Sequence, residues 1–205
     1  MRQLTALDAS FLHMETEKFV GHVGGLVLLD PSTTPSGTIT ADDVREMVRE
    51  RLHLLEPYRW RLVEVPFDLD YPYWIEAGDE FDLDFHVRDV ALPPPGTREQ
   101  LAEEVARITA RPLDRSRPLW ELSVIHGIEG GLVGLQTKIH HAAVDGASGS
   151  EILGTLFDKA PESNVPPPEK EWKAEPVKVS VPVAALNDPV TPFWLVKPST
   201  SWPLT

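Results

Sequence analysis

The distribution of proline divides the chain into two parts. Ten of its 20 prolines lie in the last 45 of its 205 residues, from Pro161 onward, in stretches such as PESNVPPPEKEWKAEP. Proline breaks a helix interior and cannot donate to a hydrogen-bond ladder, so this density excludes both a regular helix and an inner strand. We therefore predict one folded domain over residues 1–160, followed by a proline-rich linker or tail over residues 161–205.

Before these prolines, the chain alternates between strand patterns and helix patterns. The apolar run HVGGLVLLD, residues 22–30, predicts a buried strand. Helical spacing follows in TADDVREMVRERLHLL, where Thr40 is the expected N-cap. A second helix is expected where Thr97 and Gln100 match a capping box, and it ends before Pro112. Shorter strands are expected in RWRLVEV, YWIEA and FHVRDVAL.

The most informative segment is KIHHAAVDGASG, residues 138–149, because it carries two adjacent histidines. It follows LWELSVIHGIEGGLVGLQ, a pattern typical of two strands joined by a glycine-containing turn over residues 127–131. Side chains alternate along a strand. We therefore expect His141 to extend the mostly apolar face of the second strand and His140 to lie on its polar face.

A helix is expected soon after the two histidines. Ser148 and Glu151 match a capping box ahead of apolar residues at helical spacing. A strand, a short loop and a helix N-terminus would then bring a side chain close to exposed backbone N–H groups. This arrangement suits a base that acts beside developing negative charge.

Composition excludes several classes of function. The 19 Lys and Arg residues against 32 Asp and Glu residues give a formal net charge of -13, which disfavours nucleic acid as the main partner. The chain has no cysteine and therefore no disulfide and no thiolate nucleophile. A histidine pair suggests a metal, but the two rings alternate across the strand without further ligands nearby, so we expect no metal site.

The sequence shows no segment typical of export or membrane insertion. The N-terminus, MRQLTALDASFLHMETEKF, lacks the basic start and unbroken apolar run of a secretory signal. No stretch approaches the roughly 20 apolar residues that are needed to cross a bilayer. We therefore expect a cytoplasmic protein whose contact with membranes or lipid droplets, if any, is peripheral.

The histidine motif and three separated blocks carry a family resemblance. HHAAVDG resembles the HHxxxDG motif of coenzyme A-dependent acyltransferases related to chloramphenicol acetyltransferase and to peptide-synthetase condensation domains. With LTALDASFLHMET, PYRWRLVEVPFDLDYPYWIE and ARPLDRSRPLWEL, the chain is similar to the bacterial wax ester synthase/diacylglycerol acyltransferase family from about Leu4 to about Phe157. The resemblance implies an α/β, mixed-sheet, chloramphenicol-acetyltransferase-like domain, the N-terminal half of the usual two-domain enzyme.

The resemblance also implies a role for each residue of the motif. His141 would be the general base, and His140 would support it. Asp145 would organise the loop, and Gly146 would permit close chain approach or a positive φ angle. Three further residues match the family's PLW motif and are expected to shape the core around the site: Pro118, Leu119 and Trp120.

Each of these positions also has a plainer interpretation. Most histidines are satisfied by a hydrogen bond and are not catalytic, and for His140 this structural role is favoured. Asp145 is likewise expected to be structural and not a proton donor. Ser148 could help to hold an oxyanion, although helix capping is the favoured role. Three arginines could contact coenzyme A phosphates or be simply solvated: Arg111, Arg115 and Arg117.

The activity that the resemblance implies is O-acyl transfer. A long-chain acyl group would move from acyl-CoA, a co-substrate, to the hydroxyl of a diacylglycerol or of a fatty alcohol, with no bound cofactor. The products would be triacylglycerol or wax ester. Two alternatives stay open: transfer from a carrier protein to a polyketide-type alcohol, and a noncatalytic lipid-binding, acyl-CoA-binding or regulatory protein.

The chain is shorter than the family pattern. Members usually carry a second domain of related fold, and the acyl channel and reaction centre lie between the two domains. Asn187 and Asp188 lack the apolar helix pattern that follows the Asn-Asp motif of that second domain. The chain would therefore be a fragment, half of a split enzyme that pairs with a separate C-terminal chain or with itself, or a shortened binding protein.

Overall fold

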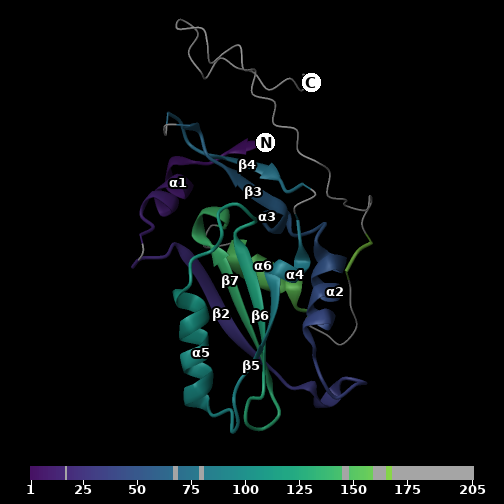
Figure 1. Cartoon of the computed structure of the whole chain (residues 1–205). Coiled ribbons are helices and arrows are strands. Elements are labelled where there is room, and N and C mark those ends of the chain that lie inside the picture. Colours follow the sequence, from purple (N-terminus) through teal and green to yellow (C-terminus); the bar gives the residue numbers. More distant parts are fainter. Residues whose placement is uncertain (17, 67–68, 79–80, 145–147, 159–164, 168–205) are drawn as a thin grey trace, which may run out of the picture.

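The structure is a computed structural model that describes residues 1–158 and 165–167, except 17, 67–68, 79–80 and 145–147. A small sheet lies above one end of a larger sheet (Figure 1). The strands are β1 (Arg2–Gln3), β2 (His22–Leu29), β3 (Trp60–Val63), β4 (Tyr73–Glu76), β5 (Val87–Ala91), β6 (Trp120–His126) and β7 (Val133–His140). The helices are α1 (Ala6–His13), α2 (Ala41–Arg51), α3 (Glu56–Arg59), α4 (Leu83–His86), α5 (Arg98–Ala110) and α6 (Ser148–Leu156), with the 3-10 helices η1 (Pro31–Thr33) and η3 (His141–Ala143).

The larger sheet has the strand order β2-β7-β6-β5, and the smaller has the order β1-β4-β3. In the larger sheet, β5 and β6 are parallel, and the crossover between them carries α5. The pairings β2–β7 and β6–β7 are antiparallel, and Trp120 of β6 lies opposite Ile139 of β7. The mixed α/β, mixed-sheet architecture that the sequence predicts is therefore confirmed.

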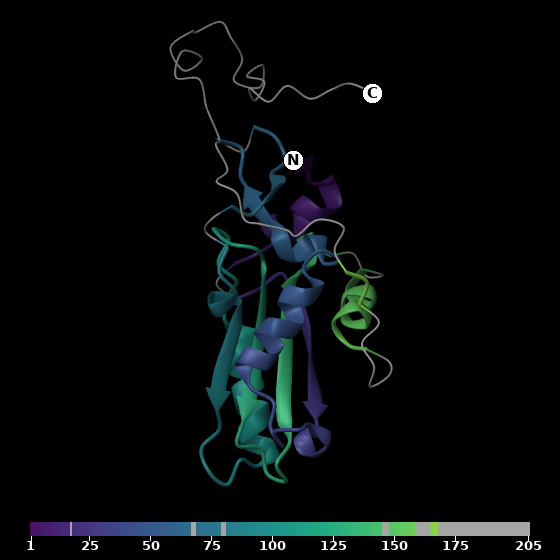
Figure 2. The same ribbon diagram turned by 90° about the vertical axis from the view of Figure 1, so that its right-hand side faces the viewer.

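Helices cover both faces of the larger sheet. Along β6, Leu122 and Val124 belong to the main hydrophobic core with residues of α2 and α6, whereas Ile125 points to the other face and packs with Leu101 and Ile108 of α5. Figure 2 shows α2 and α6 next to each other, and α5 runs along the sheet in Figure 1. The inner strands β6 and β7 are consequently buried on both faces.

Local sequence chemistry accounts for the helix starts and for the hairpin. The Thr40 and Thr97 side chains both accept a hydrogen bond from the third backbone N–H of their helix, and the side chain of that third residue accepts one from the backbone N–H of the cap, as the capping boxes predict. The β6–β7 turn places Gly127, Gly130 and Gly131 at positive φ, where a side chain would be strained. These predictions are confirmed.

Two local predictions need correction, and one helix was missed. We predicted a buried strand at residues 22–30, but β2 is an edge strand with an exposed middle, because only β7 pairs with it among the described strands. In FHVRDVAL, Phe85 and His86 belong to α4, since the Asp82 side chain caps that helical turn, and the strand begins at Val87. The sequence analysis also missed α1, which Thr5 and Asp8 cap reciprocally.

The predicted division near residue 160 stays a prediction. Almost all of residues 161–205 lie outside the described part of the chain. Asp158, two residues after the end of α6, forms an ion pair with Arg51 of α2 at 2.5 Å. The Arg51–Asp158 ion pair thus links the C-terminal end of α6 to α2, on the core side of the larger sheet.

Candidate active site

The two histidines of the motif lie at a change of backbone conformation. Strand β7 ends at His140, and His141 is the first residue of η3. The side chains of β7 alternate between the two faces as predicted, as far as His140. His140 lies on the polar face with Lys138 and Gln136. The prediction that His141 extends the apolar face of the strand is wrong, because the chain turns into a 3-10 helix there.

His140 is buried, and its two ring nitrogens have different neighbours. Its Nδ1 accepts a hydrogen bond from the Ala142 backbone N–H at 3.0 Å, so the neutral ring carries its proton on Nε2. That Nε2 lies 3.2 Å from Oε1 of Glu15. The backbone N–H of His140 donates to the Leu119 carbonyl at 2.9 Å, which joins the histidine motif to the PLW block.

His141 is only partly buried and is held in a different way. Its ring stacks on Phe11 of α1, with a centroid distance of 4.0 Å and an interplanar angle of 17°. Its backbone N–H donates to the Gly21 carbonyl at 2.8 Å, and its own carbonyl accepts from Val144. Stacking and backbone hydrogen bonds thus orient the ring of a partly exposed residue, and the ring nitrogen Nδ1 is buried.

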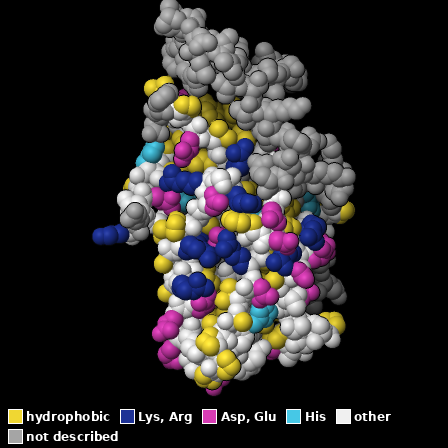
Figure 3. Space-filling view, viewed as in Figure 1, with side chains coloured by type: hydrophobic (Ala, Val, Ile, Leu, Met, Phe, Trp, Pro, Cys, Tyr) yellow, Lys and Arg dark blue, Asp and Glu magenta, His cyan; other side chains and the backbone are white. Residues whose placement is uncertain are grey.

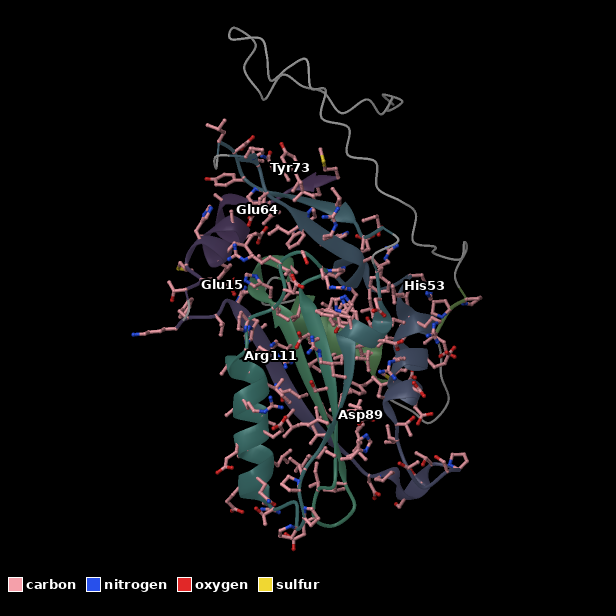
Figure 4. The ribbon with its side chains drawn as sticks, viewed as in Figure 1. Glu15, His53, Glu64, Tyr73, Asp89 and Arg111 are labelled. Atoms are coloured by element: carbon pink, nitrogen blue, oxygen red, sulfur yellow. The ribbon has the colours of Figure 1, made fainter. Side chains whose placement is uncertain are left out.

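The structure adds Glu15, which the sequence analysis did not single out. Its Oε1 accepts from the Gly21 backbone N–H at 2.8 Å, and its Oε2 lies 2.8 Å from Nη2 of Arg115. The same Nη2 donates to the Leu12 carbonyl at 2.6 Å. In Figure 4, Glu15 lies between α1 and the nearby end of the larger sheet. The only sequence signal was its place within the LTALDASFLHMET block.

Burial and charge set the protonation states of this group. Burial lowers the pKa of His140 to about 4, an effect that the nearby Glu15 carboxylate only partly offsets. Burial alone would raise the pKa of Glu15, but the Gly21 N–H, Arg115 and His140 together lower it. At neutral pH, a neutral His140 therefore faces an ionised Glu15.

Gly21 leaves room for this arrangement. A Cβ at Gly21 would lie 2.7 Å from Nε2 of His140 and 3.0 Å from the carbonyl oxygen of Phe11, whereas a Cβ at Gly25 would meet no described atom within 4 Å. The two glycines therefore form a matched pair for substitution. One is in contact with the histidine motif, and the other lies in the open part of β2.

We expect Gly21→Ala to destabilise the protein by about 1–3 kcal/mol, because the added methyl group must displace the buried His140 ring or the end of α1. Gly25→Ala should change the free energy of unfolding by less than about 0.5 kcal/mol. Urea unfolding of both variants measures the difference. Equal stability of the two variants would contradict the close packing around His140.

The PLW block forms part of the core beside the motif, as expected. Trp120 is fully buried, and its ring lies between Tyr58 at 4.1 Å and His86 at 4.3 Å. Its Nε1 donates to the Tyr58 carbonyl, and its own carbonyl accepts from Nδ1 of His86, both at 2.8 Å. Burial lowers the pKa of His86 to about 4. Pro118 and Leu119 are buried alongside.

These buried histidines make stability depend on pH. His86 and His140 titrate near 4 when folded and near 6.5 when unfolded, so the unfolded state binds more protons between these values and stability falls as pH falls. Each histidine lowers the free energy of unfolding by about 1.4 kcal/mol for every unit by which the pH falls within that window. We expect His86→Phe to remove one such contribution, measured by urea unfolding from pH 7 to pH 5. An unchanged slope would contradict the neutral, buried state of His86.

The three arginines that we considered for phosphate binding all meet carboxylates. Arg111 lies 3.0 Å from Glu121, Arg115 pairs with Glu15, and Arg117 lies 3.9 Å from Asp114. Basic and acidic side chains are interspersed over the middle of the face in Figure 3. This surface is therefore a mixture of paired charges and not a uniformly basic patch.

Several predicted site residues lie outside the described part of the chain. Asp145 and Gly146 belong to the segment 145–147, and the capping box of Ser148 and Glu151 rests on side chains that are likewise not described. The structure does show α6 after β7, as predicted, with α6 beginning at Ser148 and the 3-10 helix η3 following the end of the strand at His140. Among the described residues, no group of three or more metal-ligating side chains could hold a metal ion.

Comparison with known families and curated proteins gives consistent results. A family model described as the wax ester synthase/diacylglycerol acyltransferase catalytic domain matches residues 4–193. A Mycobacterium tuberculosis protein named as a diacylglycerol O-acyltransferase is 39% identical over 179 residues, covering 86% of this chain and 37% of the relative. Another, also so named, is 38% identical over 200 residues, covering 96% of this chain and 69% of the relative. The chain thus spans between about a third and two thirds of these relatives.

Solved structures share the fold. The wax ester synthase/diacylglycerol acyltransferase of Marinobacter aquaeolei VT8 matches with a TM-score of 0.64 and 30% identity, over 90% of this chain and 44% of that one. The starter condensation domain of the rhizomide synthetase RzmA matches with a TM-score of 0.56 and 12% identity, over 76% of this chain and 37% of that one. The second likeness supports the fold alone. In the described part of the chain, no helix is both long enough and apolar enough to span a bilayer.

Proposed function

Because the chain belongs to the wax ester synthase/diacylglycerol acyltransferase family, we propose that it carries the base-bearing part of an acyl-CoA-dependent O-acyltransferase. His141 is the proposed general base. The acceptor is the hydroxyl of a diacylglycerol or of a fatty alcohol, and the product is triacylglycerol or a wax ester. Acyl-CoA enters as a co-substrate, and the scheme needs no bound cofactor.

The contrast between the two histidines supports this assignment of the base. The His140 ring is buried, with one nitrogen accepting from Ala142 and the other facing Glu15. His141 is a partly exposed residue whose Nδ1 is buried, and it is held by Phe11 stacking and its backbone bond to Gly21. In this proposal the acceptor hydroxyl approaches Nε2 of His141, because its Nδ1 is buried and the whole of His140 is buried. This difference in access is the observation that carries the proposal.

The chemistry follows from that access. His141 takes the proton of the acceptor hydroxyl as its oxygen attacks the thioester carbonyl, and the resulting tetrahedral intermediate collapses to ester and coenzyme A thiolate. The imidazolium returns the proton to the thiolate, so the products are an ester and free coenzyme A. Backbone N–H groups at the start of α6 follow the motif in sequence and are the expected stabilisers of the oxyanion.

The rest of the site is proposed to come from a partner. In this scheme, the far side of the reaction centre is lined by a second domain, which belongs to a longer form of this chain, to a separate chain or to a second copy. The acceptors are membrane lipids or their products, so the chain would work at the surface of a membrane or lipid droplet. Carrier-protein-dependent transfer is the weaker enzyme alternative, because the Marinobacter likeness exceeds the condensation-domain likeness in both identity and coverage.

Mass spectrometry of the product tests the proposal. The chain is incubated with palmitoyl-CoA and either a diacylglycerol or hexadecanol, at low and at high chain concentration. The expected result is triacylglycerol, wax ester or both. Acyl-CoA binding without ester at every concentration would favour the noncatalytic binding protein instead.

A further inference from the structure

We propose that Glu15, held by Arg115, is a positioning residue that fixes both histidines of the motif for acyl transfer. The inference rests on the proposed function of His141 and adds to it a carboxylate from a distant part of the chain. Glu15 lies 100 residues before Arg115 and 125 residues before His140 in the sequence.

One oxygen of Glu15 reaches both histidines. Oε1 accepts from the Gly21 backbone N–H at 2.8 Å and lies 3.2 Å from Nε2 of His140. The carbonyl of the same Gly21 accepts from the backbone N–H of His141 at 2.8 Å. Glu15 therefore lies directly beside the ring of His140 and is linked to the backbone of His141 through one residue, Gly21.

The other oxygen of Glu15 connects to the helix that carries the stacking partner of His141. Arg115 donates through Nε and Nη2 to Oε2, at 3.2 and 2.8 Å, and Nη2 also donates to the Leu12 carbonyl near the end of α1. Phe11, the neighbour of Leu12, stacks on the His141 ring. Movement of Glu15 would thus disturb both the backbone and the ring contact of His141.

The protonation states fit a positioning role. His140 accepts the Ala142 N–H at Nδ1, which leaves its proton on Nε2, the nitrogen that lies 3.2 Å from Oε1 of Glu15. The lowered pKa of Glu15 keeps the carboxylate ionised, and the lowered pKa of His140 keeps the ring neutral, so the pair is a carboxylate facing an N–H donor. A carboxylate that orients an imidazole in this way selects its tautomer and its ring orientation.

The chain offers a matched control. Glu64 contacts the same Arg115 guanidinium, at 3.4 Å through Nη1, but from the exposed side, and its side chain is 62% exposed. Glu64→Gln removes the same charge from the same arginine without touching Gly21 or His140. Glu15→Gln instead places an amide N–H₂ against the Arg115 donors or against the Gly21 and His140 donors, so it cannot satisfy both sides.

Imidazole ¹⁵N spectra of the full chain at neutral pH test the positioning without any need for turnover. The wild-type His140 is expected as the Nε2–H tautomer. Glu15→Gln should shift both His140 and His141 signals, and Glu64→Gln should leave them in place. Spectra of Glu15→Gln that match those of the wild type would overturn the proposal. If Glu15→Gln does not fold, Arg115→Lys, which cannot bridge Glu15 and Leu12 with the same fork, supplies the comparison.

Kinetics separate positioning from simple stabilisation. For Glu15→Gln, we expect kcat to fall about 10–100-fold with KM for palmitoyl-CoA changed less than about 2-fold, since the base is misplaced while the binding surface remains. Unchanged kcat in an active wild-type background would refute the role even if the spectra shift. A wild-type chain without turnover would count against the proposed function, and the spectra would still decide the positioning.

Discussion

Replacement of His141 by alanine is expected to lower alcohol-dependent release of coenzyme A about 10²–10⁴-fold, the usual contribution of a well-placed general base. The physical reason is that a neutral alcohol is a poor nucleophile until a base takes its proton during attack. Because the chain has no cysteine, a thiol-reactive dye reports only the released coenzyme A.

Two further variants make this result specific. His141→Gln keeps a flat polar side chain against Phe11 and should be as inactive as His141→Ala, which separates lost chemistry from lost stacking. His13→Ala removes an exposed histidine at the end of α1 and should keep wild-type activity. The equilibrium constant for palmitoyl-CoA binding should be similar in all variants. A His141→Ala rate within about threefold of wild type would remove His141 from the role of base.

The second large effect is a loss of stability on replacement of Trp120, which lies in the core beside the histidine motif. Trp120→Ala is expected to lower the free energy of unfolding by about 3–5 kcal/mol, because the change empties the space between the Tyr58 and His86 rings. It also leaves the buried Tyr58 carbonyl without its Nε1 donor. Since a domain of this size is stable by only about 5–15 kcal/mol, the variant should be marginally folded at best.

Trp120→Phe separates the two contributions of this side chain. Phenylalanine keeps an aromatic ring between Tyr58 and His86 but cannot donate to the Tyr58 carbonyl. We expect a loss of about 1–3 kcal/mol, the cost of one buried acceptor left unpaired together with a smaller ring. Urea unfolding at pH 7 measures both variants. Similar stability of Trp120→Ala and wild type would show that the PLW block does not anchor the core.

The parts of the fold that could be predicted from the sequence are those fixed by local chemistry. The caps at Thr40 and Thr97 and the glycine turn between β6 and β7 depend on residues within a few positions of one another. The edge position of β2 could not be predicted in this way. An apolar run such as HVGGLVLLD has the same pattern whether its strand pairs on one side or on two.

In the candidate site, too, features that depend on neighbouring residues could be predicted, and contacts between distant residues could not. The histidine motif was found because its residues are consecutive, and their two environments were expected to differ. The structural cause is different from the predicted alternation, since η3 begins at His141. Glu15 and Arg115 could not be paired from the sequence, because a contact between residues so far apart depends on how α1 docks against η3. Arg115 had been considered only as a phosphate ligand or a solvated side chain.

The exposed surface of β2 bears on the proposed partner. Val23, Leu26 and Leu28 are 42%, 37% and 49% exposed on this edge strand. An unprotected edge with apolar side chains favours association, and edge strands are usually covered or blunted. The concentration series in the product assay is therefore part of the test and not a technical detail.

The most direct test of the central claim is the rate of coenzyme A release from palmitoyl-CoA, measured with and without a diacylglycerol or hexadecanol. The account predicts release that depends on the alcohol, equals the ester formed, and is lost in His141→Ala. Release that is the same without an alcohol, or that persists in His141→Ala, would contradict the assignment of this chain as the base-bearing part of an O-acyltransferase.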